Sequence, residues 1–376
     1  MAATEMDGGD EDEEHVHFKQ VLRAYEHYRE HAHARISEME CHAARLDRAS
    51  RELLRLEDKF AALRRAVECN GRVLDAIVEP HAMFEDDEQA GRSMHARALL
   101  ERPAAGRGAT PSDADMEKVK STLKQLARDW AEEGAAERAA CYGPLLADIE
   151  RLLPSESAAR PNAKVLVPGA GLGRLAWECA ARGFACQGNE VSYFMLLASN
   201  FVLNHAADLG QLEIYPYVHQ SINVRAPADQ LRPVPLPDTD PSRLPAHTPF
   251  SMCAGDFLAI YANQPGEWDC ILTCFFIDTA RDVSQYVRTI HAALRPGGVW
   301  CNVGPLLYHW AEMGPAEFSI ELSWEELRAL IVAHGFAIEL EEWLPPMTYA
   351  ANARSMLKME YECVHTVCRK AGVQHR

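Results

Sequence analysis

The chain has 376 residues, 48% of them hydrophobic, and a formal net charge of −17 at pH 7. A protein that holds phosphate backbones needs a basic face, so this charge argues against nucleic acid as the main partner and favours a small polar or cationic substrate. No apolar run reaches the about 20 residues that cross a bilayer, and the acidic start, MAATEMDGGDEDEEH, has no secretory pattern. We therefore expect no membrane association.

The eleven cysteines are odd in number and never form a CxxC pair. This usage is typical of reduced thiols in a cytoplasmic or nuclear protein, and it argues against both a disulfide framework and a zinc site. His27 and His31 lie one helical turn apart and could share a metal ion, but no third ligand is evident. A solvated helix face is the favoured interpretation of these histidines, so no metal site is predicted.

The first 14 residues are rich in acids and offer little to bury, which predicts a disordered acidic tail over 1–14. Residues 15–79 are expected to form long helices, because apolar side chains such as Phe18, Val21 and Tyr25 recur at helical spacing. A second apolar set has the same spacing: Leu53, Leu56, Phe60, Leu63 and Val67. These helices would pack on the main domain or on a second subunit, and the latter alternative predicts a homodimer through the N-terminal helices.

Residues 85–113 mix charge, glycine and proline, which is typical of a mobile linker at the end of a helical extension over 15–113. A further helix is expected at the start of the main domain, 114–376. Gln125 and Arg128, three residues apart, project from the same side of this helix. An exposed polar face would explain both residues unless a site farther along the chain needs them.

From Lys164 onward, short β-rich runs such as KVLVP alternate with helical segments such as LGRLAWECAAR. This alternation predicts an α/β fold with a parallel-type sheet and helices on both of its faces. Residues 211–249 interrupt the pattern with many prolines and little periodicity. A segment of this length inside a compact domain is typical of a lid or a substrate-binding insert.

The stretch VLVPGAGLGR reads as a strand, a glycine turn and the opening of a helix. Gly169 and Gly171 let the backbone turn tightly and approach a ligand, and the helix N-terminus offers free N–H groups. Glu190 follows 21 residues after Gly169, at the end of the next expected strand. A carboxylate at this place can accept both hydroxyls of a ribose, so the segment predicts a nucleoside-containing cofactor.

The spacing of the glycines distinguishes between two cofactors. A dinucleotide motif would need glycine at position 174, where the chain has Arg174, and the third glycine is Gly173. The resulting GxGxG is the form typical of S-adenosylmethionine sites. Asp256 ends the third expected strand, where such sites place an acid on the adenine amino group beside an apolar residue, here Phe257. A nicotinamide enzyme or a degenerate binding domain is the less favoured alternative.

With these motifs assembled, the chain resembles the carnosine N-methyltransferase family over roughly residues 15–370. The specific stretches are STLKQLARDW, VLVPGAGLGRLAWE, CQGNE, AGDF, WDCILTCFFIDTA, GPLLYHW and YECV. The resemblance implies a class I methyltransferase with a seven-stranded Rossmann-like sheet, to which this chain would add its helical extension and lid-like insert. It also implies that S-adenosylmethionine methylates the imidazole of carnosine, giving anserine, or of related histidine-containing di- and tripeptides.

The resemblance also implies particular site residues. By position, the family's cofactor contacts fall on Gln125, Arg128, Gly169, Glu190, Asp256, Phe257 and Cys274. Its peptide contacts fall on Asp278, His309 and Tyr361. The Arg128 guanidinium would then pair with the methionine carboxylate of the cofactor.

Methyl transfer to imidazole gives Asp278 a chemical role. Only the ring nitrogen with a lone pair attacks, so a carboxylate that accepts the opposite N–H fixes the tautomer and opposes the positive charge that forms. The alternative is that Asp278 caps the helix that begins at TARDVSQYV, a role that Asp282 fits better. His309, in a loop after the fifth expected strand, would bind the peptide or orient Asp278.

Two other functions remain open. A methyltransferase acting on histidine within proteins would share the fold but need an open groove, whereas a pocket capped by residues 211–249 favours a dipeptide. A non-catalytic cofactor-binding scaffold would use its helices for partners and would not need Asp278 or His309.

Overall fold

The computed structural model describes residues 8–79, 110–153, 163–206, 211–314 and 317–371. The chain divides into two compact units, each built from three separate segments. The first unit comprises Met1–Glu132, Leu197–Thr239 and Asn352–Leu357, and the second comprises Glu133–Leu196, Asp240–Ala351 and Lys358–Arg376. No described helix is long and apolar enough to cross a membrane. Most of the predicted linker over 85–113 lies outside the described residues.

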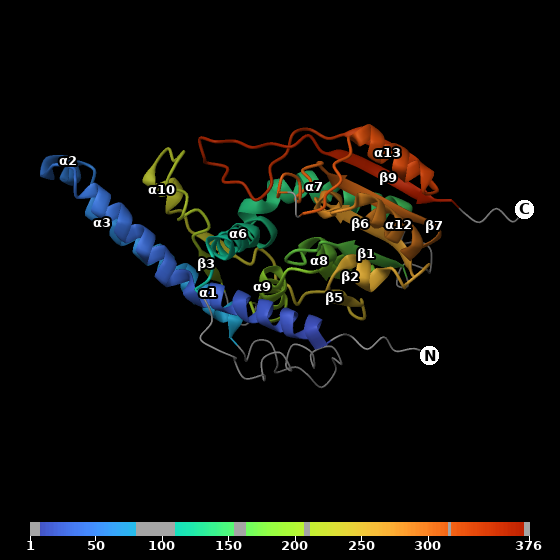
Figure 1. The fold of residues 1–376 in the computed structure, drawn as a ribbon, viewed down its shortest axis with the longest axis horizontal. Helices are drawn as coiled ribbons and strands as arrows, with labels where there is room; N and C mark the ends of the chain where they lie inside the picture. The colour runs from blue at the N-terminus through green and yellow to red at the C-terminus, as the bar shows by residue number, and fades with distance from the viewer. Residues whose placement is uncertain (1–7, 80–109, 154–162, 207–210, 315–316, 372–376) are drawn as a thin grey trace, which may run out of the picture. The chain divides into compact units, whose positions relative to one another are not determined.

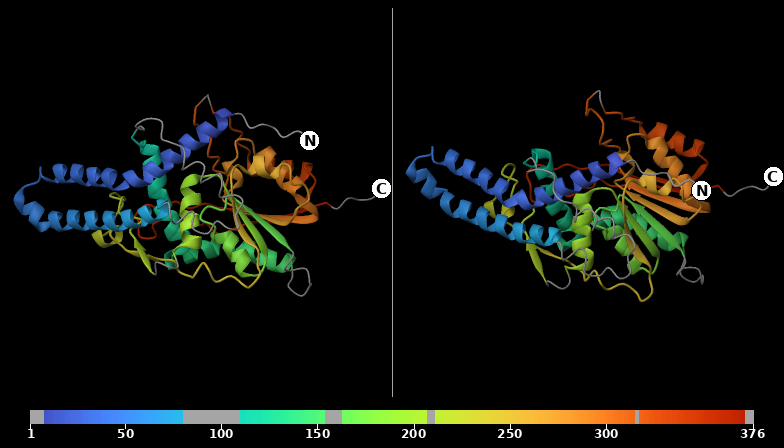
Figure 2. Two further views of the ribbon diagram at one scale, coloured as in Figure 1. Left: turned by 90° about the horizontal axis from the view of Figure 1, so that it is seen from below. Right: turned by 60° about the horizontal axis from the view of Figure 1, so that its bottom comes forward.

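Long helices form the first unit. α1 (Gly8–Ala43) and α3 (Leu56–Val78) lie side by side, both blue in Figure 2, and the short α2 (Arg48–Leu53) connects them. The predicted N-terminal helices are thus confirmed. α1 begins at Gly8, inside the segment 1–14 for which the sequence predicts disorder. Residues 1–7 of that segment lie outside the described residues.

α6 (Asp113–Trp130) packs against α1 in the same unit. It begins with a capping box, in which the Ser112 hydroxyl accepts a hydrogen bond from the Asp115 N–H and the Asp115 carboxylate accepts one from the Ser112 N–H. Val119, Leu123 and Leu126 on this helix are fully buried. The cap fixes where α6 begins, and the apolar stripe fixes which of its faces is covered.

Part of the predicted insert over 211–249 also belongs to the first unit. β3 (Leu212–Ile214) and β4 (Val234–Leu236) pair antiparallel, and the short α10 (Pro227–Gln230) lies between them. The Asn70 side chain of α3 accepts a hydrogen bond from the Tyr215 N–H at 2.6 Å and donates one to the Tyr215 carbonyl at 3.0 Å. A buried amide that satisfies both backbone groups fixes this segment on the N-terminal helices.

The second unit contains a seven-stranded sheet, as predicted, with the order β5-β2-β1-β6-β7-β9-β8. Five neighbouring strands run parallel, while β9 is antiparallel to both β7 and β8. The strands are β1 (Lys164–Pro168), β2 (Ala185–Glu190), β5 (Phe250–Ala254), β6 (Trp268–Cys274), β7 (Leu294–Gly304), β8 (Phe336–Trp343) and β9 (Val364–Lys370), labelled in Figure 1 where there is room. The helices are α7 (Ala135–Leu152), α8 (Arg174–Ala181), α9 (Tyr193–Asn204, which continues into the first unit), α11 (Phe257–Tyr261), α12 (Val283–Ala293) and α13 (Trp324–Ala333).

Two separate cores cover the two faces of this sheet. Val165 and Val167 of β1 belong to the core formed with α7 and α8, whereas Leu166 belongs to the core formed with α12 and α13. This alternation follows from the two-residue period of a strand. With both faces covered, the edge where the parallel strands end is the place where this sheet can offer backbone and side chains to a ligand.

Candidate active site

The glycine loop after β1 has the backbone that the sequence predicts. Gly169, Gly171 and Gly173 have φ angles of 63°, 55° and 79°, a region that side chains with a Cβ rarely adopt. A Cβ on Gly169 would also lie 2.4 Å from a ring carbon of Phe276. The loop leads into α8 with Gly173 as its N-cap and no capping side chain. The N-terminus of this helix is therefore available to a polar ligand group.

Glu190 ends β2 beside this loop and is only 9% exposed. Its Oε2 accepts a hydrogen bond from the Gly171 N–H at 2.8 Å. Its Oε1 accepts bonds from the Val191 N–H at 2.9 Å and the Ser192 N–H at 2.8 Å. Burial raises the pKa of Glu190, and these three bonds oppose that rise. Because a carboxylate oxygen has two lone pairs, Oε2 can still accept a hydroxyl, as a ribose contact requires.

Asp256 and Phe257 follow β5 in the predicted position. The Asp256 side chain is exposed and caps α11 by accepting a hydrogen bond from the Ala259 N–H at 2.9 Å. The Phe257 ring is 3% exposed and packs against the rings of Phe276 and Tyr286. The Phe257 side chain is therefore part of the core, which leaves its backbone as the group that can meet a ligand.

Asn189, one residue before Glu190, has a role that the sequence analysis missed. Its side-chain amide donates hydrogen bonds to the carbonyls of Cys253 at 3.2 Å and Gly255 at 2.9 Å. These bonds hold the end of β5, and hence the start of the Asp256 turn, beside the end of β2. Only the three-dimensional pairing of β2 with β5 reveals this contact.

Asp278 follows β6 in a short 3-10 turn, Ile277–Thr279, and is 2% exposed. Its Oδ2 accepts a hydrogen bond from the Leu307 N–H at 2.8 Å. Its Oδ1 is buried and has no hydrogen-bond partner within the described part of the chain. Burial raises the pKa of Asp278, while the Leu307 bond and the nearby His309 charge oppose the rise. A buried acceptor without a partner is costly, and a ligand N–H would remove that cost.

The helix-cap interpretation of Asp278 does not agree with the structure. Asp282 is the N-cap of α12, and its carboxylate accepts a hydrogen bond from the Ser284 N–H at 2.9 Å. Asp278 instead fixes the loop after β7, since the His309 N–H also donates to the Asp278 carbonyl at 3.0 Å. The His309 side chain itself is exposed.

Tyr361 belongs to a group of three aromatic residues that we call the aromatic cluster, Phe275, Tyr349 and Tyr361. The Phe275 ring centre lies 4.8 Å from that of Tyr349 and 5.9 Å from that of Tyr361. Phe275 has a φ of 51°, which is unfavourable for an aromatic residue. It follows Cys274, the partly buried last residue of β6. Strained residues of this kind concentrate at ligand sites, and Phe275 lies three residues before Asp278.

The structure brings most of the predicted residues to one edge of the sheet. Gly169, Glu190, Asp256, Cys274, Asp278 and His309 follow or end the neighbouring strands β1, β2, β5, β6 and β7. Gln125 and Arg128 lie on α6 in the first unit, where the buried Arg128 pairs with Asp129 at 2.6 Å. Their contact with the cofactor stays a prediction.

Within the described ranges, no three His, Cys, Asp or Glu side chains are placed to hold a metal ion. The ring centres of His27 and His31 lie 6.5 Å apart, and His27 pairs with Glu30 at 3.0 Å.

The sheet order, the glycine loop after β1 and the acid that ends β2 define a class I methyltransferase that uses S-adenosylmethionine. The model of the carnosine N-methyltransferase family matches residues 106–372. The carnosine N-methyltransferase of Mus musculus is 44% identical over 367 residues, which are 96% of this chain and 89% of the mouse protein. The chain belongs to the carnosine N-methyltransferase family.

Other relatives in the same family are similar over most of the chain. Carnosine N-methyltransferase unmet of Drosophila melanogaster is 37% identical, covering 96% of this chain and 81% of that protein. The carnosine N-methyltransferase of Schizosaccharomyces pombe is 36% identical, covering 95% of this chain and 97% of that protein. A solved magnesium protoporphyrin IX methyltransferase from Synechocystis, with bound S-adenosylhomocysteine, has a TM-score of 0.37 at 10% identity, covering 71% of this chain and 90% of that one.

Proposed function

We propose that this protein transfers a methyl group from S-adenosylmethionine to an imidazole nitrogen of carnosine and related histidine-containing di- and tripeptides. The observation that carries the proposal is the Oδ1 atom of Asp278, a buried acceptor that has no partner among the described residues, at the sheet edge that holds the glycine loop. The N–H of a neutral imidazole has the chemistry that this atom needs. Family membership supplies the identity of the peptide.

The residues of the site then act as follows. Asp278 accepts the ring N–H through Oδ1 while the Leu307 N–H holds Oδ2, so the opposite ring nitrogen presents its lone pair. The negative charge of Asp278 opposes the imidazolium charge that develops during transfer. The aromatic cluster supplies an apolar wall for the ring, and Tyr361 is its predicted peptide contact. The bound cofactor supplies the methyl group on a sulfonium leaving group.

The remaining predicted contacts are part of the same proposal. His309 binds the peptide from the loop that Asp278 fixes, and Gln125 and Arg128 bind the cofactor. The hydrogen bond from the Gly171 N–H to Glu190 supports the assignment of Glu190 to the ribose, since it holds the carboxylate beside the glycine loop.

The test is to incubate the purified full-length protein with labelled S-adenosylmethionine and a panel of acceptors. The panel contains carnosine, other histidine dipeptides, a dipeptide without histidine and a histidine-rich protein, with products identified by mass spectrometry. We expect methylated dipeptide and no product from the dipeptide without histidine. Methylation of the protein alone would replace the proposal with a protein-histidine methyltransferase, and cofactor binding without any product would replace it with a scaffold.

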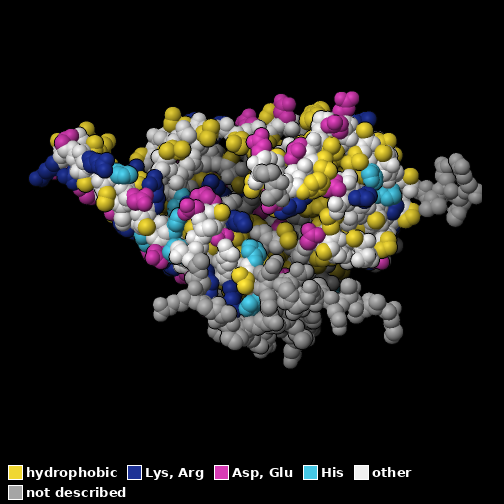
Figure 3. Space-filling view, in the orientation of Figure 1, with side chains coloured by type: hydrophobic (Ala, Val, Ile, Leu, Met, Phe, Trp, Pro, Cys, Tyr) yellow, Lys and Arg dark blue, Asp and Glu magenta, His cyan; other side chains and the backbone are white. Residues whose placement is uncertain are grey.

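We also propose a homodimer formed through the N-terminal helices and a cytoplasmic or nuclear location. At the end of the helix pair formed by α1 and α3, Leu46, Leu53 and Leu54 are 43%, 83% and 57% exposed. Figure 3 shows hydrophobic side chains there next to Lys and Arg side chains. Exposed leucines that gather in one place are typical of a contact surface. The usage of cysteine supports a reducing compartment.

A further inference from the structure

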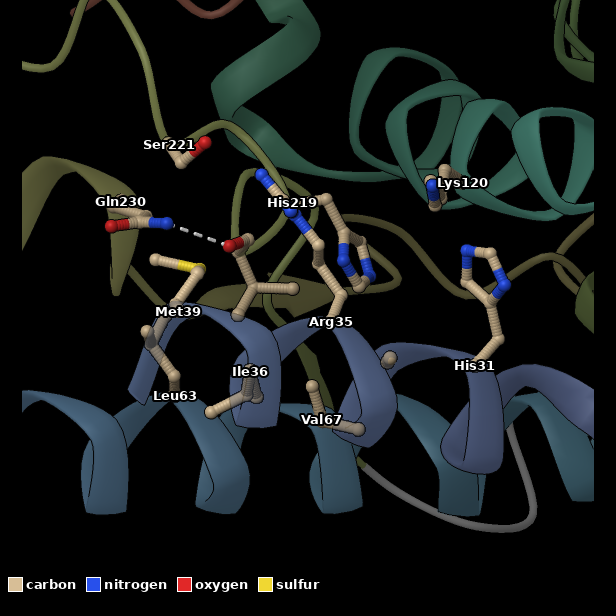
Figure 4. A pocket seen from close by; sticks show the side chains of 12 residues that line it. His31, Arg35, Ile36, Met39, Leu63, Val67, Lys120, His219, Ser221 and Gln230 are labelled. Atoms are coloured by element: carbon tan, nitrogen blue, oxygen red, sulfur yellow. Dashed lines mark hydrogen bonds between the residues drawn. The ribbon is translucent and has the colours of Figure 1, made fainter. Parts of the chain in front are cut away.

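A pocket lies within the first unit, and none of the residues that the methyl-transfer proposal uses lines it. It has a volume of about 130 Å³ and is lined by residues of α1, α3, α6 and the segment 218–230. Ile36, Leu63 and Val67 form an apolar side of this pocket (Figure 4). The polar side is lined by four basic side chains: His31, Arg35, Lys120 and His219. Among the described residues, no carboxylate lines the pocket.

We propose that this pocket binds a small oxyanion of the phosphate class, held by Arg35 and Lys120 with His31 and His219 as neutral donors. The site is independent of the methyl-transfer proposal. The ligand is either free phosphate or the phosphate group of a small monoester, both of which a pocket of about 130 Å³ can admit.

The two permanent cations of the pocket are only partly neutralised. Arg35 pairs with Glu38 at 2.8 Å, and Lys120 pairs with Glu117 at 2.8 Å. Both acids lie on the solvent side, with side chains 61% and 72% exposed, so their effect is screened by water. Lys120 is only 18% exposed. An ammonium has three donors and a guanidinium has five, so each retains N–H groups for an anion.

A series of hydrogen bonds determines which ring nitrogen of neutral His219 carries the proton. Asn70 donates to the Tyr28 hydroxyl oxygen at 2.9 Å, which leaves the Tyr28 hydrogen to donate to Nε2 of His219 at 2.8 Å. The proton of neutral His219 therefore resides on Nδ1, which has no hydrogen-bond partner among the described residues. Figure 4 shows Arg35 extending into the pocket from α1 and His219 extending into it from the loop on the opposite side. His219 thus contributes an N–H donor of fixed orientation.

The electrostatic surroundings favour an anion over a cation. Burial, followed by the charges of Lys120, His31 and Lys124, lowers the pKa of His219 to about 3. Burial and the Lys120 charge also lower the pKa of His31, against the opposing effect of Asp113 and Glu117. Both imidazoles are therefore neutral at pH 7, and the positive charge that lowers their pKa values is the same charge that attracts an oxyanion.

Binding is tested on the full-length protein with inorganic phosphate, measured by calorimetry and by thermal unfolding at pH 7. Sodium chloride at equal ionic strength is the control for screening, and glycerol phosphate tests for a monoester. We expect saturable phosphate binding that raises the unfolding temperature with concentration, as linkage requires. Tighter binding of glycerol phosphate would identify the monoester as the ligand. An equal response to phosphate, glycerol phosphate and chloride would overturn the proposal.

Two pairs of variants locate the site. Arg35→Gln is compared with Arg48→Gln, since both arginines are exposed on helices and pair with a glutamate three or four residues later. Arg35→Gln and Lys120→Gln should each weaken phosphate binding by at least about tenfold, and Arg48→Gln should leave it unchanged. Equal affinity in all three variants would place the anion elsewhere and overturn the proposal. The exposed Arg35 keeps the test decisive even if Lys120→Gln folds poorly.

Discussion

Asp278 differs from other acids of the site because its two oxygens have different surroundings. Oδ2 must remain an acceptor for the Leu307 N–H, whereas Oδ1 is buried without a partner in the described chain. Asp278 is 2% exposed and only one of its two oxygens accepts a hydrogen bond from the described chain. This arrangement lowers the stability of the fold, which the carboxylate of a helix cap or of an exposed acid does not do. The structure thus gives a physical reason for the resemblance-based assignment.

Asp278→Asn is expected to reduce turnover by on the order of 10²–10⁴, the range for a positioned acid–base partner. The Asn oxygen would stay on the Leu307 N–H, so the NH₂ group would occupy the position of Oδ1 and repel the ring N–H. The unfolding temperature should not fall, because burial already disfavours the charge. Initial rates and thermal unfolding, measured on one preparation, check both statements.

The matched control is Asp282→Ala, which removes the cap of α12 four residues away. It should cost about 0.5–2 kcal/mol of stability and leave the turnover of folded enzyme near normal. Near-normal turnover in Asp278→Asn would contradict the proposed role.

At the scale of elements, the turn between β1 and α8 combines two constraints on Gly169. Its φ is 63°, and a Cβ would lie 2.4 Å from the Phe276 ring. Gly183, at the end of α8, has a φ of 85° with no atom within 4 Å of an added Cβ. An alanine at Gly183 would therefore introduce backbone strain alone, whereas an alanine at Gly169 would introduce both backbone strain and steric overlap.

Gly183→Ala should cost about 1–2 kcal/mol, the strain of a side chain in the left-handed region. Gly169→Ala should cost a further ~1–3 kcal/mol, because Phe276 must move, and it should also weaken S-adenosylmethionine binding. Denaturant unfolding and calorimetry measure the two effects. Equal stability loss and unchanged cofactor affinity in both variants would show that the turn does not need to be this tight.

A second element-scale feature joins α7 to the antiparallel end of the sheet. His365 of β9 is 3% exposed and lies between Asp148 of α7, at 2.7 Å, and Glu342 of β8, at 2.9 Å. Burial lowers the pKa of His365, but hydrogen bonds to Asp148 and Glu342 outweigh it, and the net effect raises the pKa. The imidazolium then holds three elements together.

This contact should make stability depend on pH. Because the folded-state pKa is raised, the contribution is complete below the unfolded value of about 6.5 and is lost as pH rises through the folded value. His365→Gln should lower the free energy of unfolding most at pH 5.5–6, by up to ~3 kcal/mol. The loss should diminish toward alkaline pH. Urea unfolding across this range measures it, with the exposed loop variant His247→Asn as a control that should show no such trend.

At the scale of the whole molecule, the sequence predicts the strands better than the units. The strands are short segments bounded by turn residues, most of them apolar and β8 with apolar and acidic residues interspersed, so all seven could be predicted, together with the glycine loop and Glu190. The first unit could not, because it is assembled from three distant segments. The prolines of residues 211–249 predict a lid or a substrate-binding insert, whereas the hydrogen bonds between Asn70 and Tyr215 show where part of this segment packs.

Local departures from regular structure account for the other differences. Leu53 has helical spacing with Leu56, yet it is 83% exposed, because the chain leaves the helix and Arg55 adopts a φ of 49°. The strained backbone of Phe275 and the hydrogen bonds that the Asn189 side chain donates likewise depend on residues that are distant in sequence but close in space. Periodicity reports which face of an element is apolar, and it contains no information on such contacts.

The position of β9 between β7 and β8 has a consequence for biosynthesis. β8 hydrogen-bonds only to β9 within the sheet, and β9 comes 20 residues later in the chain. On a ribosome, β8 therefore emerges before the strand that will pair with it, and for that interval its backbone is open to other chains. Its sequence, FAIELEEW, places Glu339, Glu341 and Glu342 along this stretch. Repulsion between these like charges disfavours pairing of the β8 strands of two nascent chains before β9 of each chain has been synthesised.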